Sequence, residues 1–168
     1  MRARSSAAAL LLAAAACAGS ERATVPEGAE PRLGDAWFAW RADQLGITAQ
    51  EAKARDAALP EDEPPEGLDT PALRREAAAM WRSLCASCHG ANGRLENVPE
   101  MEPMPKKWSG MGPDMGFFFG GDKMRAGIYR SIRYGGEPVN GAPSPMPAWG
   151  DALAREQIWL LVRHLETF

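Results

Sequence analysis

One five-residue motif constrains this chain more than any other feature. Residues 85–89 read CASCH, and Gly90 follows. C-x-x-C-H is the pattern through which haem is attached covalently to a polypeptide. The thiols of Cys85 and Cys88 are spaced to bond one porphyrin, and His89 comes next, so its imidazole can reach the iron from the same side. The motif therefore predicts one covalently bound haem c near the middle of the chain.

Two other kinds of site use a C-x-x-C pair. A redox-active disulfide usually sits between a strand and a helix, whereas the residues before Cys85 have a helical pattern. A structural zinc site needs four ligands in most cases. The chain has three cysteines and two histidines and no second C-x-x-C pair, so a zinc site would have to use Cys85, Cys88, His89 and His164. We therefore favour haem attachment.

The first sixteen residues have the pattern of an export signal. Two basic residues, Arg2 and Arg4, precede an apolar run over residues 7–16. This run is too short to span a bilayer, which takes a helix of about twenty residues, but it fits the apolar region of a secretory signal peptide. We expect residues 1–16 to be removed and the protein to be exported to the periplasmic side of a bacterial envelope membrane.

Cys17 follows a run of small residues, an arrangement that resembles the bacterial lipoprotein signal, although Ala14 stands where that signal has Leu. In such signals the cysteine is lipidated and becomes the first mature residue. The alternative is ordinary cleavage after Ala16, which would leave a soluble periplasmic protein with a free cysteine, an awkward leftover in an exported chain. We expect acyl chains on Cys17 to anchor the protein, because no later segment is apolar enough to span a membrane.

Charge is unevenly distributed. Residues 17–71 hold five basic and twelve acidic groups, whereas residues 72–168 hold twelve basic and ten acidic groups. The acidic balance of the whole chain is not that of a nucleic-acid-binding protein. The acidic half fits a solvated tail, and the basic half fits a surface that steers an acidic redox partner toward the haem; the sequence leaves both interpretations open.

Composition divides the rest of the chain into four segments. These are a tether, a partly helical N-terminal extension, an acidic Pro-rich linker and a haem domain, over residues 17–33, 34–58, 59–71 and 72–168. In the extension, Thr48 and Glu51 form the capping-box pattern of a short helix. The aromatic residues Trp37, Phe38 and Trp40 either pack on the haem domain or form a surface for a partner, and we favour packing.

The haem domain begins with a strong helix signal. Thr70 can cap a helix whose first residue is Pro71, and apolar residues then recur at helical spacing as far as Cys85. The sequence therefore predicts a helix that runs directly into the C-x-x-C-H motif.

Two further helices are predicted after a long irregular stretch. Residues 95–121 are rich in Pro and Gly, and we expect them to wrap the edge of the haem without regular structure. A second helix is predicted over residues 122–133, ended by Gly135, and a last helix begins from a cap at Asp151. The fold class is therefore all-α, with three or four short helices around one haem, joined by long Pro/Gly loops.

Met146 is the candidate for the second axial ligand of the iron. Filling both axial positions suits electron transfer, and thioether sulfur favours the ferrous form. Met146 lies between Pro145 and Pro147, whose fixed φ angles lower the entropy lost in holding the sulfur on the iron. The alternatives are four methionines of the irregular stretch and one histidine: Met101, Met104, Met111, Met115 and His164.

The haem domain resembles a class I cytochrome c over residues 72–168. The resemblance rests on Trp81, on the C-x-x-C-H-G motif, on Met146-Pro147-x-Trp149 and on the closing pattern of residues 158–165. It implies that the first and last helices cross and that a proline carbonyl, from Pro99 or Pro103, orients the axial histidine. His164 stands where the family usually has Tyr.

The resemblance also implies a function. Cys85 and Cys88 would hold the haem, and His89 and Met146 would ligate the iron of a one-electron carrier that serves redox proteins, with no small-molecule substrate and no enzymatic reaction. It offers five candidate haem surroundings, of which the first three are preferred: Trp108, Tyr129, Arg133, Arg125 and Arg130. The alternatives are a haem subunit of a larger oxidoreductase, docked through residues 34–58, and a peroxidase-like or gas-sensing protein with an open iron site.

Overall fold

The computed structural model describes residues 29–138 and 141–168. The predicted signal peptide and Cys17 lie outside these residues. The elements that it describes are helical, without strands: α1 (Asp35–Leu45), α2 (Ala49–Ala57), α3 (Pro71–Met80), a π-helical turn η1 (Trp81–Cys85), α4 (Ala86–His89), α5 (Met111–Tyr134) and α6 (Arg155–Leu165). The all-α prediction is confirmed. Within the described part of the chain, none of the helices has the length and apolar character needed to cross a membrane.

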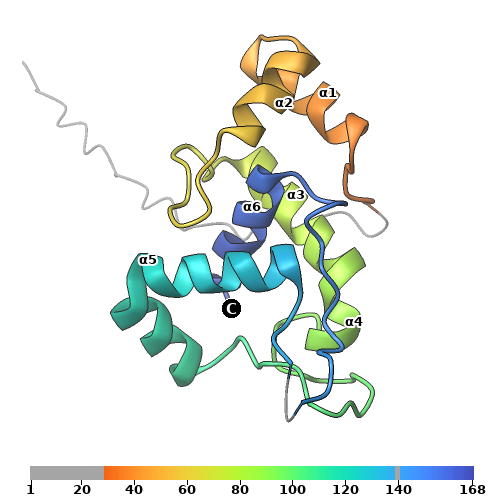
Figure 1. Ribbon diagram of the computed structural model, residues 1–168, viewed down its shortest axis with the longest axis vertical. Coiled ribbons are helices and arrows are strands. Elements are labelled where there is room, and N and C mark those ends of the chain that lie inside the picture. Colours follow the sequence, from red (N-terminus) through yellow and green to blue (C-terminus); the bar gives the residue numbers. More distant parts are fainter. Residues whose placement is uncertain (1–28, 139–140) are drawn as a thin grey trace, which may run out of the picture.

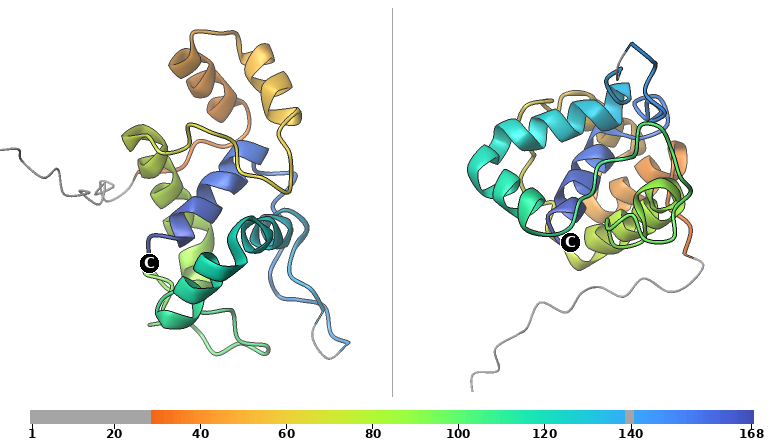
Figure 2. Two further views of the ribbon diagram at one scale, coloured as in Figure 1. Left: turned by 90° about the vertical axis from the view of Figure 1, so that its left-hand side faces the viewer. Right: turned by 90° about the horizontal axis from the view of Figure 1, so that it is seen from below.

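The core lies where α6 packs against α3 on one side and α5 on the other, an arrangement that can be followed in Figures 1 and 2. The side chains of Met80, Ile158 and Val162 are completely buried there. Tyr129 of α5 stacks on Trp159 of α6 at 4.5 Å between ring centroids, and both side chains are also fully buried. Apolar burial of this kind is the main stabilising contribution to the fold.

The long helix that carries the haem motif starts as predicted. The Thr70 hydroxyl accepts a hydrogen bond from the Leu73 amide at 3.2 Å, and Pro71 is the first helical residue. The chain then continues through the π-helical turn and α4 without leaving the helical path. A π-turn inside an α-helix is rare and is often found at functional sites, and here it ends at Cys85, the first residue of the C-x-x-C-H motif.

The N-terminal extension is folded onto the domain. Both hydrogen bonds of the predicted Thr48–Glu51 capping box are present at the start of α2. Trp37 of α1 is only 1% exposed, so the favoured packing interpretation of the aromatic residues is confirmed for it. Arg32, which the sequence places in the tether, is bound to Glu76 of α3.

Two element boundaries differ from the sequence-based expectation. Residues 111–120 are helical rather than irregular, because the glycines that favoured a loop serve close packing: a Cβ on Gly116 would lie 2.7 Å from the sulfur of Met124. The helix breaks at Gly121 (φ 49°), one residue before the predicted start. The final helix begins after Ala154 rather than at Asp151, because its first amides are bound by a distant carboxylate, Asp56.

The burial of His164 in α6 predicts that the protein loses stability in acid. Burial lowers the pKa of His164 to about 4 from 6.5; its ring lies beside Trp81 and Phe168. The folded state therefore binds fewer protons than the unfolded state between pH about 6.5 and about 4, and the free energy of unfolding falls as the pH drops through that range, by about 3 kcal/mol in full.

His164→Phe should remove this part of the acid sensitivity, as measured by denaturant unfolding at several pH values. An unchanged pH profile in the variant would contradict the assigned burial of a neutral imidazole.

Candidate haem-binding site

The motif residues lie at the end of the first long helix. Cys85 is the last residue of η1 and is half-buried, Cys88 is exposed, and His89 ends α4. The two cysteines are not joined in a disulfide. Because they lie three residues apart on this helical segment, they are separated by about one turn, which is the arrangement that two thioether bonds to one porphyrin require.

A backbone carbonyl orients the predicted axial histidine. His89 Nδ1 lies 3.0 Å from the carbonyl oxygen of Lys106, so the ring donates Nδ1–H and keeps Nε2 available for iron. Such a hydrogen bond fixes the ring and raises its basicity. The carbonyl belongs to neither Pro99 nor Pro103, the residues expected from the resemblance. Sequence reasoning missed Lys106 because a backbone acceptor carries no residue signature.

The turn after the motif depends on two glycines. Gly90 has φ +80°, and a Cβ there would lie 3.1 Å from the amide nitrogens of Leu95 and Glu96. The Trp108 amide donates to the carbonyl of Gly93 at 2.8 Å, and a Cβ on Gly93 would lie 3.0 Å from Cβ of Trp108. Trp108 is thus held beside the motif, as its predicted role in the haem surroundings requires.

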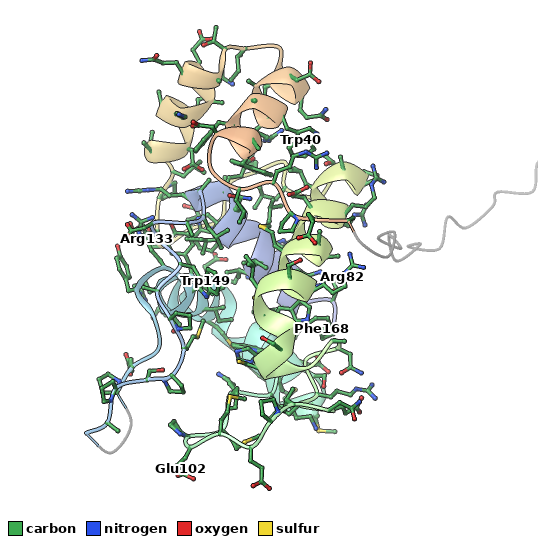
Figure 3. The ribbon with its side chains drawn as sticks, turned by 90° about the vertical axis from the view of Figure 1, so that its right-hand side faces the viewer. Trp40, Arg82, Glu102, Arg133, Trp149 and Phe168 are labelled. Atoms are coloured by element: carbon green, nitrogen blue, oxygen red, sulfur yellow. The ribbon has the colours of Figure 1, made fainter. Side chains whose placement is uncertain are left out.

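Trp81 supports the motif from the core side. Its ring is 4% exposed, its Nε1–H donates to the carbonyl of Ala91 at 3.1 Å, and its centroid lies 5.8 Å from that of His89. The ring of Phe168 packs edge-on against that of Trp81, with 4.9 Å between the ring centroids. In Figure 3, Phe168 lies beside the lower part of the green helix that carries the motif. His89 therefore lies against the buried ring of Trp81.

Tyr129 and Arg133 have partners away from the motif. Tyr129 stacks on Trp159, and Arg133 Nε lies 3.2 Å from a carboxylate oxygen of Glu61, so its charge is already paired. Neither contact brings these side chains to the C-x-x-C-H motif. The motif itself fits a haem, because two thiols about one helical turn apart accompany an imidazole whose Nδ1 is bound and whose Nε2 stays available.

Two further predicted haem neighbours, Arg125 and Arg130, and one residue that was not predicted, Ser109, have the following surroundings. Ser109, which follows Trp108, is 5% exposed, and its hydroxyl is buried without a hydrogen-bond partner; no sequence pattern singles it out. Arg125 is paired with Glu166 and Asp122, and Arg130 is exposed.

The loop that carries Met146 is pinned to the end of α5. The Gly136 amide donates to the carbonyl of Met146 at 3.2 Å, and the Trp149 amide donates to the carbonyl of Ile132 at 2.9 Å. Met146 is half-buried and packs against the core. In Figure 3 this loop (blue) and the helix that carries the C-x-x-C-H motif (green) lie on opposite sides of the lower half of the molecule.

The electrostatics of the cysteines disfavour a redox-active disulfide. Burial, reinforced by the neighbouring Cys88, raises the pKa of the Cys85 thiol to about 12. Redox-active cysteines have a lowered pKa, because the thiolate is the reactive form. Among the residues that the structure describes, there is also no group of three or more His, Cys, Asp or Glu side chains suited to a metal ion, so a zinc site finds no support.

A matched pair of glycine variants tests the attachment turn. Gly90 and Gly141 both have φ +80°, but a Cβ on Gly141 would meet nothing within 4 Å. Alanine at a positive φ costs roughly 1–2 kcal/mol at either position, whereas the clash arises only at Gly90. Gly90→Ala should therefore lower both the free energy of unfolding and the haem bound per chain more than Gly141→Ala. Equal effects of the two substitutions would contradict the tight turn.

The comparisons with known proteins agree with this site. Residues 72–165 match the sequence model of a family described as cytochrome C oxidase, cbb3-type, subunit III. No curated protein and no solved structure gave a match. The matched range contains the C-x-x-C-H motif, the Met146 loop and helices α5 and α6, and it leaves out the N-terminal extension. The chain therefore belongs to this family of c-type cytochrome domains, with a class I cytochrome c fold and a covalently bound haem c.

Proposed function

We propose that the protein is a one-electron carrier of the bacterial envelope, with His89 and Met146 as its axial ligands. Haem-based electron transfer and exchange with redox partners follow from the family; the ligand pair, the location and the absence of an enzymatic reaction are our proposal. A bound haem c supplies a centre that takes up and releases one electron. The observation that carries the proposal is the hydrogen bond from His89 Nδ1 to Lys106, which leaves Nε2 for the iron.

The chain's own residues can keep such a centre six-coordinate. His89 is held on one side by the Lys106 carbonyl and the ring of Trp81. In Figure 3 the loop of Met146 lies across the lower half of the molecule from the helix that carries His89, and backbone hydrogen bonds fix it to α5. A ligand held on a fixed loop exchanges slowly with water, which favours electron transfer over reactions at an open iron site.

Met146 is favoured over the other methionines by its packing. Met104, Met111 and Met115 are 51%, 81% and 48% exposed, so their side chains are not held by the core. Met146 is half-buried against it. Met101, the remaining methionine of the 95–121 stretch, donates its amide toward the sulfur of Met104 at 3.5 Å, so these two neighbours interact with each other.

A second candidate function is that of a fixed haem subunit of a larger oxidoreductase. It is favoured by the matched family, whose description names an oxidase subunit. Extraction in mild detergent separates the two: a carrier purifies alone, and a subunit purifies with other membrane proteins in constant ratio.

Met146→Ala should remove the sulfur–iron bond. The ferric protein has a weak absorption band at the near-infrared edge when thioether sulfur binds the iron, and we expect this band to disappear in the variant and the reduction potential to fall, because the ferrous form loses its soft ligand. Met104→Ala is the control and should keep both. If the band survives in Met146→Ala, the second axial ligand is another residue.

The location is tested at Cys17. We propose that this residue is lipidated and that the acyl chains hold the protein at a membrane, so Cys17→Ser should move it from the membrane fraction to the soluble periplasmic fraction. The intact mass of the purified wild-type protein should include one haem and the acyl chains on a chain that begins at Cys17. A mass without acyl chains, together with a soluble wild type, would favour ordinary cleavage.

A further inference from the structure

We infer that residues 29–61, here called the N-terminal clamp, are a fixed part of the cytochrome fold that completes the ends of α3 and α6, and are not a mobile arm for docking a partner. The inference goes beyond the proposed electron transfer, which does not use these residues. It rests on four sets of contacts, each between the clamp and a part of the domain distant in the sequence.

The clamp supplies the missing N-terminal cap of α6. The first amides of a helix have no partners within the helix and are usually capped by a local side chain. At α6 the N-cap residue is Ala154, which has no side-chain acceptor. Instead, the Arg155 and Glu156 amides donate to the two carboxylate oxygens of Asp56 at 3.0 and 2.8 Å. A carboxylate at a helix N-terminus also interacts favourably with the helix dipole.

A half-buried ion pair fixes α1 to the same turn of α6. The guanidinium of Arg41 makes a bidentate contact with the Glu156 carboxylate, with nitrogen–oxygen distances of 2.7 to 2.9 Å. The two side chains are 16% and 13% exposed. Bidentate pairs of this kind are among the stronger charged contacts. The side chain of Arg155 in turn donates to the carbonyl of Leu59 at 2.7 Å.

The start of the clamp satisfies two buried polar side chains of the core. Glu76 of α3 is 3% exposed, and its carboxylate accepts a hydrogen bond from the guanidinium of Arg32 at 2.6 Å. Gln157 of α6 is fully buried, and its amide donates to the carbonyl of Arg32 at 2.6 Å. An unpartnered buried carboxylate is strongly destabilising. Glu76 and Gln157 therefore need Arg32 as a hydrogen-bond partner.

Apolar contacts complete the clamp. Trp37 is 1% exposed and belongs to the same buried cluster as Leu73 and Trp159. The indole Nε1–H of Trp159, itself fully buried, donates to the carbonyl of Pro60 at 3.0 Å. In Figure 1 the clamp covers the end of the α3–α6 pair opposite α4.

The clamp therefore determines which surfaces a redox partner can reach. It occupies the end of the domain away from the haem motif, and the family match, which begins at residue 72, leaves it out. A partner must dock elsewhere on the haem domain, and removing contacts of the clamp should affect folding of α6 but not recognition by a partner.

The test cuts the chain after the clamp. A protease site is inserted between Asp62 and Glu63, which are exposed, in the holoprotein carrying Cys17→Ser so that both fragments are soluble. After native cleavage, the clamp fragment should co-elute with the haem-bearing fragment in size-exclusion chromatography. It should separate from that fragment in the Arg41→Ala/Asp56→Ala double variant. Lys53→Ala is the control, since it removes an ion pair with Asp35 that is exposed to solvent, and it should leave the fragments together.

Hydrogen exchange on uncut protein gives a second readout that does not depend on the double variant folding. The amides of Arg155 and Glu156 should exchange at least tenfold faster in Asp56→Ala than in the wild type, while Asp56→Asn, which keeps one oxygen acceptor, should stay closer to wild type. Separation of the fragments in the cut wild type would overturn the inference, and so would equal exchange in Asp56→Ala and the wild type.

Discussion

The packing of α6 against α3 is the contact on which the other parts of this molecule depend. Met80, Ile158 and Val162 are completely buried in it. The contact fixes the direction of the helix that ends in the haem motif, and it places Trp81 beside His89. Other elements then pack on this pair: α5 on α6, and α2 of the clamp on α6 at the far end.

The two ends of the α3–α6 pair serve different purposes. At one end, backbone hydrogen bonds and two closely packed glycines, Gly90 and Gly93, shape the turn after His89. Small displacements there would disturb the haem site. At the other end, the contacts are charged side chains and capping groups, such as Arg41 and Asp56, that hold the clamp in place. The family match covers the first end and begins at residue 72, after the clamp.

Local signals in the sequence predicted much of this structure. Thr70 with Pro71, the Thr48–Glu51 box and Gly135 as a helix end are all found where the sequence places them, because each acts within a few residues of itself. Covalent haem attachment could likewise be predicted from five consecutive residues.

Interactions between distant segments could not be predicted. The sequence could not show that Asp56 would cap α6 in place of Asp151, since the two partners lie about a hundred residues apart. It could not show that residues 111–120 are helical, because Gly116 accommodates a side chain from beyond the break at Gly121. The sequence also could not identify the carbonyl of Lys106 as the hydrogen-bond partner of His89, because any residue can provide a backbone carbonyl.

The most direct test of the account is whether the haem stays on the polypeptide when the fold is destroyed. The purified protein is denatured, extracted with acidified acetone, and the precipitated chain is redissolved for its absorption spectrum and mass. We predict that the colour remains with the chain and that one haem is linked through Cys85 and Cys88. A colourless chain, with all pigment in the acetone, would contradict covalent attachment and with it the site described above.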